Sequence, residues 1–248
     1  MKLFVYHTPE RVPHQVTADC AIAIDVLRAT STIATALKAG AEGVQVFSDL
    51  QTLISTSESW DQAHRILVGE RGGKTVEGFD MGNSPLDCTP ERVKQSRLFM
   101  STTNGTRALE CIRSAPIVLT AAFINREAVV KFLVQHQPEV VWLVGSGWEG
   151  SYALEDTGCA GAVIEGVLNY SGLSLNELAG NDEAVASVAL YQNFKDDLVS
   201  LLKHASHGKR LLGLGIYEDL EYCARLDSLE VLPIQREQGV LVKHVEAS

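Results

Sequence analysis

The chain has 248 residues, of which 46% are hydrophobic and 21% are charged. This composition excludes disordered and low-complexity proteins, because it supplies enough apolar surface for a large core. The 21 basic and 31 acidic residues give a formal net charge of −10, which argues against general nucleic-acid or anionic-membrane binding but allows a small anionic ligand in a local basic site.

Strands and helices are predicted to alternate along most of the chain. In chain order, the first part predicts strand 3–7, strand 20–25, helix 32–39, strand 43–47, helix 49–57, strand 65–69, helix 90–95, strand 97–101, helix 106–112, strand 117–121, helix 126–135, strand 140–144 and helix 154–170. Most strands are continuous apolar runs, which are typical of strands covered on both faces. The remainder predicts helices 182–194, 195–206 and 218–225 and a closing strand 231–234.

This order predicts an α/β fold with three α/β/α layers, a largely parallel central sheet and a helical C-terminal third. No linker, charge block or repeat divides the chain, so we expect a single domain over 1–248, with a subdivision near residue 171 as the alternative.

Cysteine usage and hydropathy bear on the cellular compartment. The five cysteines include no C-x-x-C pair, which argues against a disulfide framework or a structural zinc site. The apolar run 3–7 is too short for a signal peptide, and no run approaches the roughly 18 apolar residues of a membrane span. We therefore expect a cytoplasmic protein with no membrane partner and no nucleic-acid partner.

Polar residues gather after several predicted strands, where open α/β sheets bind their ligands. Asp25 ends a buried strand, where an unpaired carboxylate is costly, so we expect it to be functional. Arg28 follows three residues later and is expected to face the same ligand, the alternative being a surface or ion-paired arginine. Glu70 and Arg71 follow the strand 65–69 in the same way.

A hydroxyl-rich turn after the strand 97–101 is a candidate anion site. It consists of Thr102, Thr103, Asn104, Gly105 and Thr106. Backbone amides at the start of a helix bind anions readily, although the same residues also suit a simple capped turn.

Acidic side chains predict a hard divalent cation. Mg²⁺ takes one or two protein carboxylates together with phosphate and water oxygens, and the candidate ligands are Asp25, Asp80, Glu155 and Asp156. For the last two, a general preference for acids at helix N-termini is the alternative explanation.

Several enzyme classes are excluded by motif spacing. The sequence lacks C-x5-R, D-x-D after Asp25, R-H-G, H-E-x-x-H, the P-loop and G-x-S-x-G. Residues 145–150 do match G-x-G-x-x-G, but no strand with a terminal acid follows them as dinucleotide binding requires. We expect this glycine loop to allow close approach of a smaller ligand.

Taken together, five segments of the chain resemble the 2-phosphosulfolactate phosphatase family. They are D-V-L-R-A-T-S-T from Asp25, E-R-G-G from Glu70, G-F-D-M-G-N-S-P from Gly78, T-T-N-G-T from Thr102 and E-D-T-G-C-A-G from Glu155. The resemblance implies a Mg²⁺-dependent phosphatase that converts 2-phospho-3-sulfolactate to 3-sulfolactate and phosphate, a step of the coenzyme M biosynthesis type. It also implies a three-layer α/β/α fold outside the commoner phosphatase folds.

On this basis each candidate residue receives an expected role. Catalysis is expected from Asp25, Arg28 and Glu70, and phosphate binding from Arg28, Arg71 and residues 102–106. The metal ligands are expected among Asp25, Asp80, Glu155 and Asp156, and the sulfonate reader among Arg28, Arg71, Lys74 and Arg107. The expected partner is a small anionic phosphate ester, and a homodimer stays open as the assembly.

Two other functions stay open. A non-catalytic protein that binds a small phosphorylated or sulfonated acid would need Arg28 and the 102–106 turn but not the carboxylates. A dinucleotide-dependent oxidoreductase would use the glycine loop after Gly145 and is less favoured.

Overall fold

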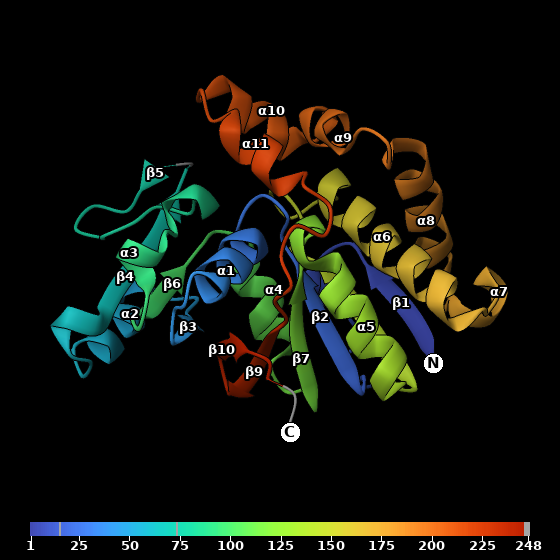
Figure 1. Cartoon of the computed structure of the whole chain (residues 1–248), viewed down its shortest axis with the longest axis horizontal. Coiled ribbons are helices and arrows are strands. Elements are labelled where there is room, and N and C mark those ends of the chain that lie inside the picture. The colour runs from blue at the N-terminus through green and yellow to red at the C-terminus, as the bar shows by residue number, and fades with distance from the viewer. Residues whose placement is uncertain (15, 73, 246–248) are drawn as a thin grey trace.

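The computed structural model describes residues 1–14, 16–72 and 74–245, and in this part of the chain the strands form one ten-stranded sheet (Figure 1). The strand order is β1-β8-β2-β7-β9-β10-β3-β6-β4-β5. The strands are β1 (Lys2–Tyr6), β2 (Cys20–Ile24), β3 (Gly43–Val46), β4 (Arg65–Arg71), β5 (Lys74–Thr75), β6 (Arg97–Ser101), β7 (Ile117–Ala121), β8 (Val140–Gly145), β9 (Pro233–Glu237) and β10 (Val240–Lys243).

The sheet contains two parallel groups, β1-β8-β2-β7 and β3-β6-β4, joined by the antiparallel hairpin β9-β10. Successive antiparallel pairings of β7 with β9, β9 with β10 and β10 with β3 mean that the two groups run in opposite senses along the sheet. The β7–β9 pairing is limited to Leu119 and Ile234. The mostly parallel sheet is therefore confirmed, but its parallel strands do not all share one direction.

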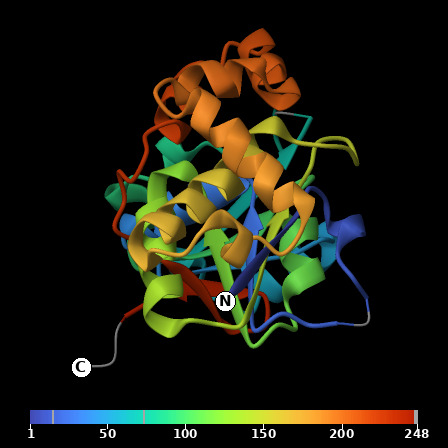
Figure 2. The same cartoon turned by 90° about the vertical axis from the view of Figure 1, so that its right-hand side faces the viewer.

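Helices cover both faces of the sheet (Figures 1 and 2). They are α1 (Ala29–Lys38), α2 (Leu50–Ser57), α3 (Pro90–Val93), α4 (Gly105–Ile112), α5 (Arg126–His136), α6 (Leu154–Ser171), α7 (Leu175–Leu178), α8 (Asp182–Phe194), α9 (Leu198–His204), α10 (Ser206–Gly213) and α11 (Glu218–Cys223). None of the helices in the described ranges is long and apolar enough to cross a membrane.

The central strand β2 shows why the core has two sides. Cys20, Ile22 and Ile24 pack into the cluster that includes α5, α6 and α8, whereas Ala21 and Ala23 pack into the cluster that includes α1 and α4. Side chains alternate across a strand, so a fully apolar strand can be buried on both faces. The three-layer α/β/α arrangement is therefore confirmed.

The C-terminal third is helical, as expected, but two details differ from the prediction. The chain closes with a two-stranded hairpin, β9-β10, rather than with a single strand at 231–234. Helix 195–206 is shorter than predicted, and a further helix, α10, follows it. Gly208 and Gly213 give this segment little helix propensity, and α10 depends on packing, because a Cβ at Gly208 would lie 1.7 Å from the Leu202 carbonyl oxygen.

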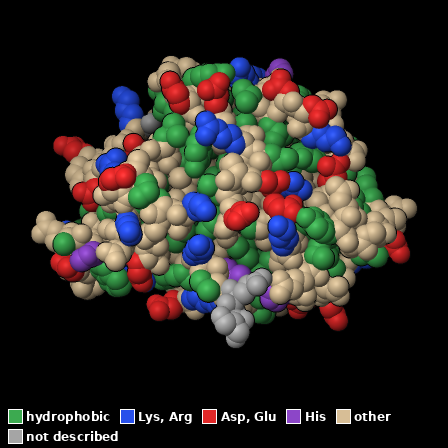
Figure 3. Space-filling view, viewed as in Figure 1, with side chains coloured by type: hydrophobic (Ala, Val, Ile, Leu, Met, Phe, Trp, Pro, Cys, Tyr) green, Lys and Arg blue, Asp and Glu red, His purple; other side chains and the backbone are tan. Residues whose placement is uncertain are grey.

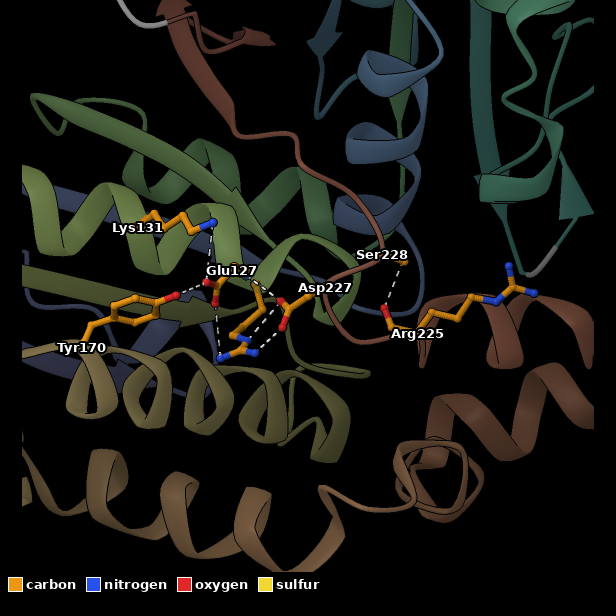
Figure 4. Close-up of polar contacts among 7 residues, drawn as sticks. Glu127, Lys131, Tyr170, Arg225, Asp227 and Ser228 are labelled. Carbon is orange, nitrogen blue, oxygen red and sulfur yellow. Dashed lines mark hydrogen bonds and ion pairs between the residues drawn. The ribbon is translucent and has the colours of Figure 1, made fainter.

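Helices α9, α10 and α11 form a roof, defined here as residues 198–223, beyond one edge of the sheet (Figure 1). Asp227, just after the roof, accepts hydrogen bonds from Arg126 Nε at 3.1 Å and from the backbone amide of Glu127 at 2.6 Å. Figure 4 shows Asp227 beside the start of α5, where Glu127 also meets Lys131 and Tyr170. This network ties the C-terminal end of the roof to α5.

On the face shown in Figure 3, acidic and basic side chains are interspersed, and neither sign dominates. The charges that matter for the candidate site are mostly buried.

Candidate functional site

Asp25 lies directly after β2 and is buried, with 5% of its surface exposed. Its Oδ1 accepts the backbone amide of Ala29 at 3.2 Å, while Thr30 bonds to the Asp25 backbone. Burial raises the pKa of Asp25 to about 6, against hydrogen bonds from Ala29 and Ser146 that lower it. Glu70 raises this pKa further and Arg28 lowers it, so both predicted neighbours lie within electrostatic reach of Asp25.

The turn between β6 and α4 meets Asp25 from the other parallel group of strands. Gly105 starts α4, and a Cβ placed on it would lie 2.6 Å from Asp25 Oδ2 and 2.5 Å from the Ala29 Cβ. Only a glycine allows this approach of the backbone to the carboxylate. The segment after β6 thus reaches the residue that follows β2, although the two groups run in opposite senses.

Asp156, on the first turn of α6, acts as a clamp between β2 and β8. Its Oδ1 accepts the Val26 amide at 3.0 Å, and its Oδ2 accepts the Ser146 amide at 3.1 Å and the Ser146 hydroxyl at 2.9 Å. Burial, followed by the charges of Glu155 and Asp25, raises its pKa well above the usual range. The carboxylate oxygens are thus used to hold the strand ends together.

Glu155 is buried beside Asp156, with 3% of its surface exposed. Burial raises its pKa to about 7, and the charge of Asp25 contributes to the increase. Asp25, Glu155 and Asp156 therefore repel one another in a buried site, and such repulsion favours either a shared proton or a bound cation.

Arg28 occupies the N-cap position of α1 and is buried in an ion pair, which was the alternative expected for it, with a partner that the sequence did not indicate. Its Nη1 lies 2.6 Å from Oδ2 of Asp219 on α11, and Asp219 Oδ1 accepts the Ser84 hydroxyl at 2.7 Å. The Arg28 Nε and the nearby Asn83 Oδ1 are buried and have no hydrogen-bond partner within the described residues. Buried polar atoms are normally paired, so Arg28 Nε is able to donate to an acceptor such as a ligand oxygen.

Glu70 and Arg71 lie at the end of β4. Glu70 is buried, with 8% of its surface exposed. Arg71 holds the β4 and β6 ends together, because its Nη2 donates to the Ser101 hydroxyl at 2.9 Å and its Nη1 to the Glu70 carbonyl at 2.8 Å. Gly72 follows in a left-handed conformation with φ of +62°. Gly73 lies outside the described residues.

In the 102–106 turn, two hydroxyls are engaged within the turn itself. The Thr102 amide donates to Thr106 Oγ1 at 3.0 Å, and the two hydroxyls lie 3.3 Å apart. Asn104 occupies the N-cap of α4 without a side-chain capping bond, and Thr103 is exposed. The contacts of Thr102 and Thr106 match the expected capped turn, and Gly105 lies against Asp25, while anion binding by this turn stays a prediction.

Three residues that were predicted to belong to the site have no described contact with Asp25. Asp80 is exposed, and its Oδ2 accepts the Leu67 amide at 2.7 Å. Arg107 is paired with Glu10 at the surface, and Lys74 is exposed on β5. The described contacts of these residues do not join them to Asp25.

The roof supplies residues that the sequence analysis missed. The His207 ring on α10 stacks on Trp148 of the glycine loop, with centroids 4.1 Å apart, and donates to the Leu27 carbonyl. Burial, followed by the charges of Arg28 and Arg210, lowers the His207 pKa to about 3. Arg210 Nη2 donates to the Gly72 carbonyl at 2.8 Å. No strand-end motif marks these residues, because they come from a separate helix.

The donor chemistry fits Mg²⁺ with few protein ligands. No cluster of three or more His, Cys, Asp or Glu side chains suited to a metal occurs in the ranges that the structure describes. Asp156 is committed to its three hydrogen bonds, which leaves Asp25 and Glu155 as a pair of hard carboxylates. One or two carboxylates are what Mg²⁺ sites with a phosphate ligand typically use.

The glycine loop after β8 is not arranged as a dinucleotide site. Trp148 and Ser151 exchange backbone hydrogen bonds of 3.0 and 2.9 Å across a tight turn with Gly150 at φ of +75°. The Ser146 amide donates to the Asp156 carboxylate, so it is not free to bind a pyrophosphate oxygen.

Comparison with known proteins gives one consistent result. Residues 6–238 match the family model for 2-phosphosulpholactate phosphatase. The chain is 65% identical to a protein of Cyanothece sp. over 98% of this chain and the whole of that protein. It is 63% identical to a protein of Nostoc sp. and 61% identical to one of Thermosynechococcus vestitus, over at least 97% of both chains. Each of these relatives is named a probable 2-phosphosulfolactate phosphatase.

Proposed function

The chain belongs to the 2-phosphosulpholactate phosphatase family, and on this premise we propose that it hydrolyses 2-phospho-3-sulfolactate to 3-sulfolactate and phosphate with the help of Mg²⁺. Membership makes it a phosphoric monoester hydrolase. The product would serve a pathway of the coenzyme M type. The observation that carries the proposal is the buried acid Asp25, which directly follows β2 and lies within electrostatic reach of Glu155, Glu70 and Arg28.

Asp25 and Glu155 would hold the metal ion. When bound, Mg²⁺ would supply positive charge against the phosphoryl oxygens. The same charge would relieve the repulsion between the two carboxylates, whose pKa values burial raises to about 6 and about 7.

Arginines would bind the phosphoryl group. Arg28 keeps its Nε buried and unpaired within the described residues, while Asp219 fixes the orientation of its guanidinium. A phosphate oxygen would complete the hydrogen bonds of Arg28, and charge-assisted bonds of this kind are about twice as strong as neutral ones. Arg71, at the end of β4, would face the same group from the other side.

Glu70 would orient the attacking water and accept its proton. In the reaction, the water oxygen bonds to phosphorus, the bond between phosphorus and the C2 oxygen of the substrate breaks, and that oxygen takes up a proton. Positioning and electrostatic stabilisation dominate phosphoryl transfer, which suits a site whose side chains are held by Asp156, Asp219 and Ser101.

Phosphate release from 2-phospho-3-sulfolactate tests this proposal directly. We expect turnover with Mg²⁺, loss of turnover after treatment with EDTA, and recovery when Mg²⁺ is added back. Full turnover after exhaustive chelation would contradict the role of the metal. Tight binding of the substrate with no release of phosphate, with or without Mg²⁺, would instead support a non-catalytic binding protein.

A further inference from the structure

Helix α10 of the roof contacts three of the loops that form the candidate site. His207 stacks on Trp148 in the loop after β8 and donates to Leu27 in the loop after β2. One turn later, Arg210 donates to Gly72 in the loop after β4. The helix therefore lies across the mouth of the site, and Arg210 stands at its exposed rim.

Arg210 differs from Arg28 and Arg107 in its partners. Arg28 is paired with Asp219, and Arg107 with Glu10. The described contacts of Arg210 are one backbone carbonyl, Gly72 O, and the face of Trp148, whose ring centroid lies 5.9 Å from the guanidinium carbon. No acidic side chain pairs with it in the described part of the chain. Only Nη2 is used, which leaves further N–H groups to donate.

Arg210 is also close enough to Arg28 for both charges to act on one residue. The positive charges of Arg28 and Arg210 both lower the pKa of the His207 ring, so the two guanidinium groups lie within electrostatic reach of the same residue of α10. In a chain with a net charge of −10, such a local pair is what an anionic ligand with more than one acid group needs.

We propose that Arg210 binds an acid group of the substrate other than the phosphate ester, and so determines specificity for a phosphate ester that carries a further oxyanion. This inference rests on the proposed function. Arg28, buried beside Asp25, would take the phosphate, and Arg210, at the rim, would take the sulfonate or carboxylate at the other end. A guanidinium matches either group with two parallel hydrogen bonds.

The two products provide separate probes of the two ends of the site. We would titrate 3-sulfolactate and inorganic phosphate into the wild type, Arg210→Gln, Arg210→Lys and Lys209→Gln. We expect Arg210→Gln to weaken 3-sulfolactate binding at least tenfold and to change phosphate binding less than twofold, with Arg210→Lys intermediate. Lys209→Gln removes the same charge at the neighbouring exposed position of α10 and should match the wild type.

Kinetics give an independent measurement. For 2-phospho-3-sulfolactate, Arg210→Gln should raise KM at least tenfold and change kcat less than threefold. For glycerol 2-phosphate, which carries the same secondary phosphate ester but no second acid, kcat/KM should stay within twofold. Melting temperatures of all variants identify any loss of folding.

The outcomes separate the two proposals. Equal weakening of both products, unchanged binding of 3-sulfolactate in folded Arg210→Gln, or no binding of 3-sulfolactate to the wild type would overturn the role of Arg210. If the wild type binds 3-sulfolactate through Arg210 but releases no phosphate from any ester, the specificity site stands and the proposed hydrolase function fails.

Discussion

Arg28 and Asp219 form a buried ion pair between residues that lie 191 positions apart, with Nη1 and Oδ2 separated by 2.6 Å. The pair joins the loop after β2 to helix α11 of the roof. Ser84 donates to the same carboxylate, so a third segment is held at this point. The candidate phosphate-binding arginine is thus oriented by the C-terminal part of the chain.

Loss of the Asp219 charge should destabilise the fold strongly. Asp219→Asn leaves the Arg28 guanidinium buried without its counter-charge, which should lower the free energy of unfolding by about 3 kcal/mol. Urea denaturation measures this change. The matched control, Glu10→Gln, breaks the exposed pair with Arg107 and should cost less than about 1 kcal/mol. Equal effects of the two variants would show that the Arg28–Asp219 pair behaves as a surface contact.

Removal of the Asp25 charge should abolish most activity without unfolding the protein. Asp25→Asn should lower kcat by a factor on the order of 10²–10³, equivalent to about 3–4 kcal/mol of transition-state stabilisation. The melting temperature should not fall, because burial raises the Asp25 pKa to about 6 and the charge is therefore unfavourable to folding. Asp196→Asn, an exposed control, should change neither quantity. A stable Asp25→Asn protein with more than about a tenth of wild-type kcat would move the chemistry to another acid.

A methyl group at Gly105 should displace Asp25. The Cβ of Gly105→Ala would lie 2.6 Å from the Asp25 carboxylate and 2.5 Å from Ala29, so kcat should fall at least tenfold although alanine favours the helix. Gly213→Ala, on α10, meets nothing within 4 Å and should keep full activity with equal or higher stability. Kinetics and thermal melts of both variants provide the test, and normal kcat in Gly105→Ala would show that the contact is not needed.

Mg²⁺ should stabilise the folded protein through Asp25 and Glu155. At a concentration about 100 times Kd, the ion should raise the melting temperature by roughly 5–10 °C, and Glu155→Gln should remove most of this shift. In metal-free buffer at pH 8, Glu155→Gln should melt at or above the wild-type temperature, because it eliminates a buried charge whose pKa burial raises to about 7. Glu110→Gln, an exposed change on α4, should retain the full shift. An undiminished shift in Glu155→Gln would exclude this residue as a ligand.

His207 should make the protein less stable in acid. Its pKa is lowered from 6.5 to about 3 in the folded state, so the unfolded chain binds the proton more readily below pH 6.5. The stability contributed by the neutral ring is complete above pH 6.5 and falls as the pH decreases towards 3, by about 2 kcal/mol at pH 5. His207→Phe, which keeps an aromatic ring against Trp148, should lose less stability between pH 7 and pH 5 than the wild type. Urea denaturation measures the free energy of unfolding of both proteins at each pH. An equal loss in the wild type and in His207→Phe would show that His207 does not cause the acid destabilisation.

Much of the fold could be predicted from the sequence, because strand and helix signals are local. The continuous apolar run of β2 indicates burial on both faces, and Asp25 at its end stands out because a carboxylate there is costly to bury. The predicted acids Asp25, Glu70, Glu155 and Asp156 do share one electrostatic environment. These inferences need only the spacing of side chains along the chain.

The tertiary structure decided which of these side chains are committed to holding the fold and which are open to a ligand. Asp156 and Glu155 are neighbours in sequence, yet only Asp156 is used to clamp the ends of β2 and β8. Asp219, His207 and Arg210 carry no local signal, because their importance comes from partners more than 50 residues away. The opposite senses of the two parallel strand groups likewise depend on the hairpin β9-β10, which pairs with β7 on one side and with β3 on the other. Long-range pairing and burial determine which of several similar side chains hold the fold and which are open to a ligand. The local spacing of residues along the chain does not contain this information.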